Sequence, residues 1–329
     1  MRAVCLMFLS VLCFACGGQD GCREVPETDF TQTSISLERL ESELFSLKSR
    51  DEVASYLNRN KGMSIGLLHA NEYPSIDVLA GRLYKLISDS SISELVKESI
   101  DAFDEGKFIA EYSECLNRFK GYVPNASIPK VQTAVTGLYN DLYITDSLIV
   151  VGLDFFIGPK GKYMPKDIPE YILRRYTHDH LVPTLGNFII GGYSRNGKEN
   201  TLLSEMIDYG KIYYTLSMTL PCVNDELIIG FKPDEMVDVK QHQEIIWASL
   251  LENEVLYETE EFMKTKFLGE RPNVYEIGDN CPGRIGAWVG WEIVRSYMEK
   301  WPDTSIAELL EMDNHHELFA KSGYKPKNN

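Results

Sequence analysis

The sequence predicts an α+β fold that is mostly α-helical and carries a small sheet near the middle of the chain. Apolar residues recur at helical spacing before residue 120 and again after residue 168. Between these regions, residues 129–136 alternate with the period of two that a half-buried strand shows. Residues 147–157 form a β-branched apolar run that ends at Gly158-Pro159, which predicts a second, more buried strand.

The helical regions lead us to expect one mixed domain over residues 34–326, divided into a helical part (34–120) and a second part (121–326). Near its start, four leucines repeat at helical spacing: Leu37, Leu40, Leu44 and Leu47. Ser49 followed by Glu52 is a capping-box pattern, which should begin the next helix. Further helices are expected over residues 169–191, 201–216, 238–253, 284–300 and 305–320.

The composition excludes some classes of function. The chain has 329 residues, 44% of them hydrophobic, so it should bury a core. Its formal net charge of −16 argues against nucleic-acid binding, because a phosphate-binding surface needs a basic patch. The same charge argues against electrostatic docking on anionic lipid. Solubility through self-repulsion is the simpler explanation.

The N-terminus predicts export and lipid attachment. Residues 1–15 combine a positive charge at Arg2 with an apolar run that is too short to span a membrane, as in a signal peptide. They are followed by Cys16-Gly-Gly, as in a bacterial lipobox, although Cys13 stands where that pattern has leucine. We expect cleavage before Cys16 and its lipidation, a flexible tether over residues 16–33, and no transmembrane helix after processing. Ordinary secretion is the alternative.

Four cysteines remain beyond the lipid site: Cys22, Cys115, Cys222 and Cys281. An exported protein can oxidise them, but four cysteines allow three pairings and the sequence does not choose among them. Since no C-x-x-C spacing occurs among them, a zinc knuckle is not expected.

The histidines do not form a metal-binding pattern. No two of the six are four residues apart, and no His-Glu-x-x-His sequence occurs. His178 and His180 are two residues apart, which places them on different faces of a helix, so we interpret them as part of a solvated turn. His315 and His316 are expected to lie exposed on a helix.

The stretch TLLSEMIDYG (201–210) has Glu205 in the place of the catalytic glutamate of a zinc-peptidase helix, but Ser204 and Asp208 in place of the two histidines. A third ligand would come from the next helix, where Glu244 is the candidate. Taken alone, the stretch favours an ordinary amphipathic helix.

A longer block changes this interpretation. Residues 282–297 (PGRIGAWVGWEIVRSY) resemble the gliding-motility lipoprotein family GldB of Bacteroidota. Five other segments share the resemblance: 151–158, 209–214, 220–221, 244–247 and 322–326. It covers roughly residues 120–326. Gly286 and Gly290, one turn apart among aromatic residues, also predict close helix packing in the core rather than a ligand site.

The family is in turn similar to gluzincin-type zinc peptidases, which implies a degenerate zincin-like domain. By this resemblance, Ser204 and Asp208 occupy the histidine positions, Glu205 the catalytic position and Glu244 the third-ligand position. A serine hydroxyl is a poor zinc ligand, and carboxylates suit Ca²⁺ or Mg²⁺ better. We therefore expect no catalytic zinc, no cofactor and no enzymatic activity. A metal held by Asp208, Glu244 and His242 is the alternative for this site.

The resemblance implies a lipid-anchored protein of the cell envelope, expected on the periplasmic face of the outer membrane. Its role would lie in gliding-motility or secretion machinery, through binding other envelope proteins. Two alternatives stay open. One is an exported zinc-dependent metallopeptidase with atypical ligands. The other is a solute-binding lipoprotein, which would need a ligand cleft.

Overall fold

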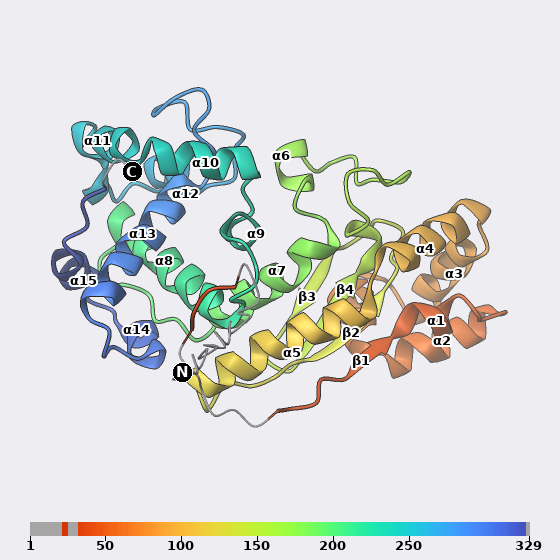
Figure 1. The fold of residues 1–329 in the computed structure, drawn as a ribbon. Coiled ribbons are helices and arrows are strands. Elements are labelled where there is room, and N and C mark those ends of the chain that lie inside the picture. The colour runs from red at the N-terminus through yellow and green to blue at the C-terminus, as the bar shows by residue number, and fades with distance from the viewer. Residues whose placement is uncertain (1–21, 26–31, 327–329) are drawn as a thin grey trace, which may run out of the picture.

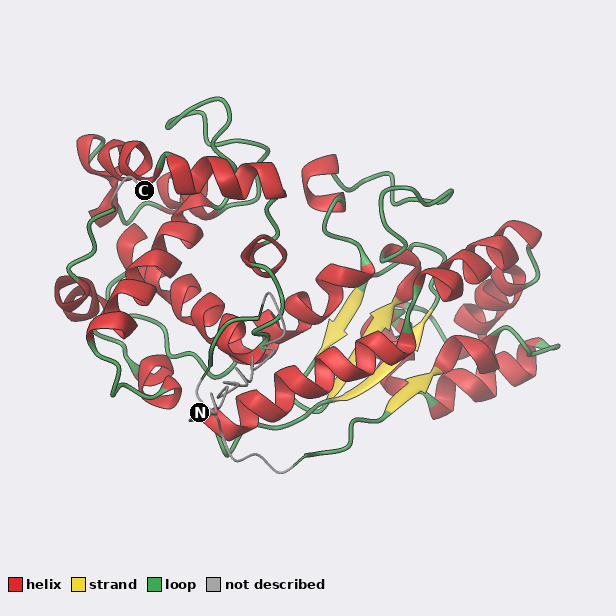
Figure 2. Cartoon of the chain, viewed as in Figure 1, coloured by secondary structure: helices red, strands yellow, loops and turns green. Residues whose placement is uncertain are grey.

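The computed structural model describes residues 22–25 and 32–326, and has the predicted α+β fold, mostly helical with one small sheet (Figures 1 and 2). The predicted signal peptide (1–15) and the lipid site Cys16 lie outside the described residues. Among the described residues, no helix is long and apolar enough to cross a membrane.

The elements follow one another along the chain in this way. The strands are β1 (Leu37–Arg39), β2 (Lys130–Ala134), β3 (Leu142–Ile144) and β4 (Leu148–Gly152). The helices of the first part are α1 (Leu40–Leu44), α2 (Arg50–Arg59), α3 (Ile76–Ile87), α4 (Ser90–Ala102) and α5 (Glu105–Tyr122). Those of the second part are α6 (Glu170–Leu173), α7 (His178–Gly191), α8 (Leu202–Thr219), α9 (Asp225–Ile229), α10 (Pro233–Gln241), α11 (Gln243–Glu252), α12 (Glu261–Leu268), α13 (Ile285–Lys300), α14 (Ile306–Glu311) and α15 (His315–Ser322). Shorter helical turns are η1 (Gly62–Leu67), η2 (Ala70–Glu72), η3 (Leu153–Phe155) and η4 (Val255–Tyr257).

The sheet has the strand order β1-β2-β4-β3. β1, β2 and β4 run parallel, with Val131 of β2 opposite Leu37 on one side and Ile149 on the other. β3 pairs with β4 in the antiparallel direction, with Tyr143 opposite Val150. β3 is therefore an edge strand, and its outer side pairs with no other strand of the described chain.

The first part of the chain differs from the expectation at one point. Residues 34–120 were expected to be helical, but residues 37–39 form β1, and the helix begins only at Leu40. Leu37 fits the helical leucine spacing, yet it pairs with Val131, 94 residues later. A partner so distant in sequence leaves no trace in local periodicity. The predicted cap at Ser49 is confirmed, because its side chain accepts a hydrogen bond from the N–H of Glu52.

The sheet is buried on both faces. Val131, Ile149 and Val151 contribute to a large core shared with α5, α7, α8 and α13. Ala134 and Val150 belong to a second core with α1, α2, η1 and α3. In Figure 1, α5 lies along the sheet, α1–α4 gather at its β1 side, and the later helices extend beyond β3.

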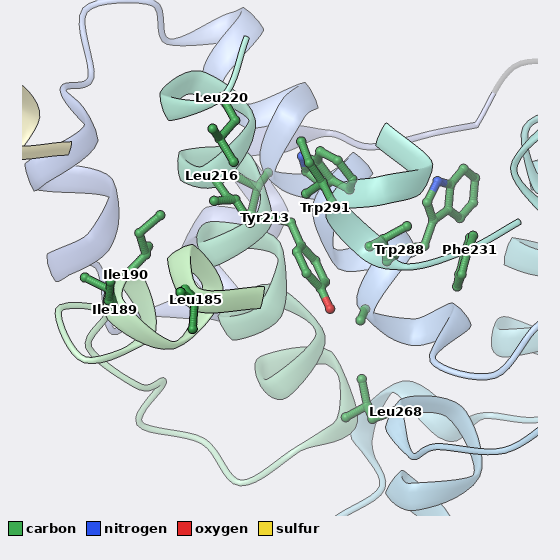
Figure 3. Close-up of a cluster of buried hydrophobic side chains, with 14 of the residues drawn as sticks. Leu185, Ile189, Ile190, Tyr213, Leu216, Leu220, Phe231, Leu268, Trp288 and Trp291 are labelled. Carbon is green, nitrogen blue, oxygen red and sulfur yellow. The ribbon is translucent and has the colours of Figure 1, made fainter. Parts of the chain in front are cut away.

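The closest helix pair is α8 and α13, and two glycines allow it. A Cβ on Gly290 would stand 1.7 Å from the carbonyl oxygen of Met206, and one on Gly210 would stand 2.2 Å from the carbonyl oxygen of Gly290. Trp288 and Trp291 of α13 are fully buried beside this contact (Figure 3). The predicted close packing of this segment in the core is confirmed.

Several predicted helices are interrupted. Residues 169–191 form α6 and α7, residues 238–253 form parts of α10 and all of α11, and residues 305–320 form α14 and most of α15. Two further helices, α9 and α12, were not expected. Each interruption lets the chain change direction, which apolar spacing alone does not reveal.

One disulfide joins distant parts of the chain, which answers the open question of pairing. Cys22 is bonded to Cys222, and Cys115 and Cys281 are free and buried. Arg23 strengthens the connection, since its N–H donates to the carbonyl of Pro221 at 2.9 Å and its side chain forms an ion pair with Asp225.

The α8–α13 contact predicts a large difference between two glycine substitutions. Gly290→Ala should lower the free energy of unfolding by about 1–3 kcal/mol, because the methyl group overlaps backbone atoms that cannot move aside. Gly278→Ala is the matched control, since no atom lies within 4 Å of an added Cβ there. Chemical denaturation of both variants measures this. Equal stability of the two would contradict the packing described.

Candidate functional site

Helix α8 positions the residues that the sequence singled out. It begins after Thr201, whose side chain accepts a hydrogen bond from the N–H of Ser204 and so caps the helix. Ser204 and Asp208 lie four residues apart on one face, as their spacing requires. Glu205 is directed to a neighbouring face. The structure thus brings Ser204 and Asp208 together and gives Glu205 different partners.

Ser204 is buried against His315 of α15. The Ser204 hydroxyl lies 3.0 Å from Nδ1 of His315, and Nε2 of His315 lies 3.1 Å from the carbonyl oxygen of Met312. Nδ1 also lies 2.9 Å from the carbonyl oxygen of Ser204, so both ring nitrogens lie within hydrogen-bond distance of a carbonyl oxygen. His315 was expected to be exposed, and that prediction is wrong, because its exposed fraction is 0%.

Asp208 belongs to the same polar cluster. Its Oδ1 lies 3.5 Å from Nε2 of His315 and 3.6 Å from Nζ of Lys211, and it accepts a hydrogen bond from the N–H of Gly197 at 3.2 Å. The Lys211 ammonium is fully buried and also donates to the carbonyl of Met312 at 2.8 Å. Burial raises the pKa of Asp208 to about 6 and lowers that of Lys211. Burial, with the nearby Lys211 charge, lowers the pKa of His315 to about 4.

Glu205 is bound to a buried lysine. It forms an ion pair with Lys264 of α12, whose side chain is 1% exposed. Lys264 also donates to Oδ1 of Asn200 at 2.8 Å and pairs with the exposed Glu261 at 3.2 Å. The hydrogen bond to Glu205 raises the pKa of Lys264. The Glu205 carboxylate is therefore occupied by an ion pair within the protein.

Glu244 lies exposed in the first turn of α11. His242 precedes that helix and lies 3.1 Å from Asp238. Over residues 22–25 and 32–326, no group of three or more His, Cys, Asp or Glu side chains is arranged to hold a metal ion. The alternative set of Asp208, Glu244 and His242 therefore does not form such a group.

A cleft of about 1000 Å³ lies on the other side of α8. Tyr209 and Tyr213 of α8 line it, together with Leu142 and Ile144 of β3. The lining also includes residues of α7, among them Phe188. The cleft thus lies between the free edge of the sheet and the helix that carries the polar cluster. The solute-binding alternative requires such a cleft, which was not expected from the sequence.

Two arginines and a glutamate that line this cleft form one charged group. Arg175 Nη2 lies 2.8 Å from Oε1 of Glu270, and Nε of Arg284 lies 3.5 Å from the same oxygen. Arg284 also donates to the carbonyl of Ile229 and to the hydroxyl of Tyr213. The guanidinium of Arg284 is therefore held in place by three elements.

The interpretation of His178 and His180 as a solvated turn is wrong. His178 is the first residue of α7, and its Nε2 lies 3.0 Å from the carbonyl oxygen of Asp104. His180 lines the cleft, 2.7 Å from the hydroxyl of Thr177. Burial, with the Arg175 charge beside it, lowers the pKa of His180 to about 4.

Sequence reasoning missed Lys211, Lys264 and His315, the three partners of the α8 residues. A signal existed for His315, because it shares a helical face with Leu318 and Ser322, three and seven residues later, which are both buried. For Lys211 the signal was its spacing of three residues from Asp208 on the same helix. For Lys264 no signal existed, since its partner Glu205 lies 59 residues away.

The polar cluster predicts a pH-dependent effect of His315→Gln. The ring has a folded-state pKa of about 4 against an ordinary value of 6.5, so its contribution to stability is present above pH 6.5 and is lost as the pH falls toward 4. The variant should be destabilised by about 1–3 kcal/mol at pH 7 and by less at pH 4.5. Denaturation over this range measures the difference, with the exposed neighbour His316→Gln as control. A loss of stability that is equal at pH 7 and pH 4.5 would contradict a neutral, buried ring.

Comparison with known proteins places the chain in a family. Searches of curated proteins and of solved structures found no match. A comparison with protein-family models matched residues 21–326 to the family described as gliding motility protein GldB. That range covers nearly the whole chain and contains α8, the polar cluster and the cleft. The chain therefore belongs to the gliding motility protein GldB family.

Proposed function

We propose that this chain is a non-catalytic lipoprotein of the cell envelope that supports gliding motility or secretion by binding other envelope proteins. It would be anchored through Cys16, on the periplasmic face of the outer membrane. Residues 121–326 would be a degenerate form of a gluzincin-type peptidase domain, in which α8 has kept its packing and given up its metal.

One observation carries the proposal. The three α8 positions compared with a zinc-peptidase helix are taken by interactions within the protein. Ser204 and Asp208 bond to His315 and Lys211, and Glu205 bonds to Lys264. A catalytic zinc helix needs ligands that are free to hold metal and a glutamate that is free to move a proton. The family description supports the motility part of the proposal.

A solute-binding lipoprotein is a second candidate, favoured by the cleft of about 1000 Å³. Its walls are mostly apolar and aromatic with a few charged groups, as in many small-molecule sites. An exported metallopeptidase with atypical ligands is a weaker candidate, since its metal would have to displace the buried ammonium groups from Asp208 and Glu205.

The absence of catalysis can be tested with metal analysis and two glutamate variants. We expect no stoichiometric zinc in the untagged full chain and no hydrolysis of unfolded casein. Glu205→Gln should lower the melting temperature by several degrees, because it leaves the buried Lys264 with a weaker partner. Glu261 contacts the same lysine from an exposed position, so Glu261→Gln should change the melting temperature little.

Two outcomes would contradict this prediction. One tightly held zinc per chain is the first. The second is casein hydrolysis that Glu205→Gln abolishes and Glu261→Gln preserves.

The envelope role predicts that anchoring and surface spreading depend on Cys16. In a strain lacking the gene, wild-type chain and Cys13→Ala should restore spreading and enter the membrane fraction, because Cys13 would leave with the signal peptide. Cys16→Ala should be released from the membrane and fail to restore spreading. Membrane-bound Cys16→Ala would contradict the anchor. Normal spreading and secretion in the deletion strain would contradict the motility role.

A further inference from the structure

Two arginines in the cleft share a single acidic partner. Arg175 and Arg284 both approach Oε1 of Glu270, and within the described chain neither has an ion pair with another carboxylate. Gly230 allows the two side chains to come together, since a Cβ there would stand 2.4 Å from Cδ of Arg175 and 3.1 Å from Nη2 of Arg284. This group therefore carries two positive charges against one carboxylate, while Asp141 and Asp146 line the cleft beside β3.

The arginines are the fixed members of this group and Glu270 is the accessible one. The exposed fractions of the side chains are 21% for Arg175, 13% for Arg284 and 42% for Glu270. Burial, with the charge of Arg284 beside it, lowers the pKa of Arg175. A second carboxylate entering the cleft would complete the pairing. Guanidinium groups suit this task because they bind carboxylates through two parallel hydrogen bonds.

The other wall of the cleft offers free backbone groups. Asp141 and Thr145 are hydrogen-bonded to β4, through Gly152 and Leu148. The alternation of an antiparallel ladder therefore turns the backbone groups of Leu142 and Ile144 away from β4.

Most of these outward-facing backbone groups have no hydrogen-bond partner within the described residues. The N–H of Leu142 is taken by the side chain of Asp141, but the N–H of Ile144 and the carbonyls of Leu142 and Ile144 have no hydrogen bond within residues 22–25 and 32–326. Both residues also line the cleft. An unpaired strand edge of this kind accepts an extended peptide as an additional strand.

We propose that the cleft binds an extended acidic polypeptide segment, which pairs with the outer edge of β3 and places a carboxylate on Arg175 and Arg284. The inference rests on the proposed function, since it names the class of partner that the envelope protein would bind. Tyr209 and Phe188 would contact the apolar side chains of the segment. A small solute would use the arginines, but it would leave the edge of β3 unpaired.

The proposal is tested first with peptides. The purified full chain is exposed to an array of acetylated and amidated random nonapeptides, and the best binder is made again in two altered forms. One form replaces its acidic residue by glutamine, and the other methylates alternate backbone nitrogens. Each change should weaken binding by about tenfold or more, since the first removes a charge-assisted contact and the second a strand pairing. No selectivity for acidic peptides, or equal binding of either altered form, would overturn the proposal.

Variants of the chain then identify the site. Arg175→Gln and Arg284→Gln should weaken binding of the acidic peptide by about tenfold, while Glu270→Gln should strengthen it by removing the competing carboxylate. Arg59→Gln, an exposed arginine paired with Glu43 outside the cleft, should leave binding unchanged. Melting temperatures show which variants remain folded. Weaker binding by a folded Glu270→Gln would mean that the group is only structural, and would overturn the assignment.

Competition separates the peptide from a small ligand. Free succinate should displace the bound peptide only at concentrations far above those at which a competing acidic nonapeptide displaces it. Equal potency of the two would overturn the peptide in favour of a solute. Absence of peptide binding together with lost spreading in the Cys16→Ala strain would overturn this inference alone and leave the proposed function standing.

Discussion

The backbones of α8 and α13 meet at Gly210 and Gly290 with no room for a side-chain carbon between them. This contact fixes the rotation of α8 about its own axis, because any other face would bring a side chain against the α13 backbone. With the rotation fixed, Ser204 and Asp208 must face His315, Glu205 must face Lys264, and Tyr209 and Tyr213 must face the cleft. The polar cluster and the cleft wall are thus two consequences of one close helix contact.

The charged groups around α8 show how charged side chains can be buried in a core. Lys211 and Lys264 are both withdrawn from solvent, and each is paired with a carboxylate and bonded to further acceptors. Burying such groups costs more than it returns unless every bond is made, so the arrangement tolerates little change. The arginines of the cleft differ, since their partner Glu270 remains accessible to solvent. The same helix therefore borders a closed ionic cluster on one side and an open one on the other.

Predictions from the sequence succeeded where the cause was local. The alternation of residues 129–136, the cap at Ser49 and the glycine spacing of α13 each describe a short segment, and the structure has all three features. Predictions failed where a distant partner decided the outcome. β1 exists because of β2, and His315 is buried because α15 packs against α8. The cleft could not be foreseen at all, since its lining comes from many separate segments spread between residues 127 and 284.

The disulfide between Cys22 and Cys222 sets how far the folded body could stand from a lipid on Cys16. A tether that ran unattached from Cys16 to residue 33 could extend about 60 Å, at roughly 3.5 Å per residue. The bond to Cys222 shortens the free part to the six steps between Cys16 and Cys22, or about 20 Å. The loop at Pro221 would then remain beside the lipid headgroups, and the protein would meet its partners from a nearly constant height above the membrane.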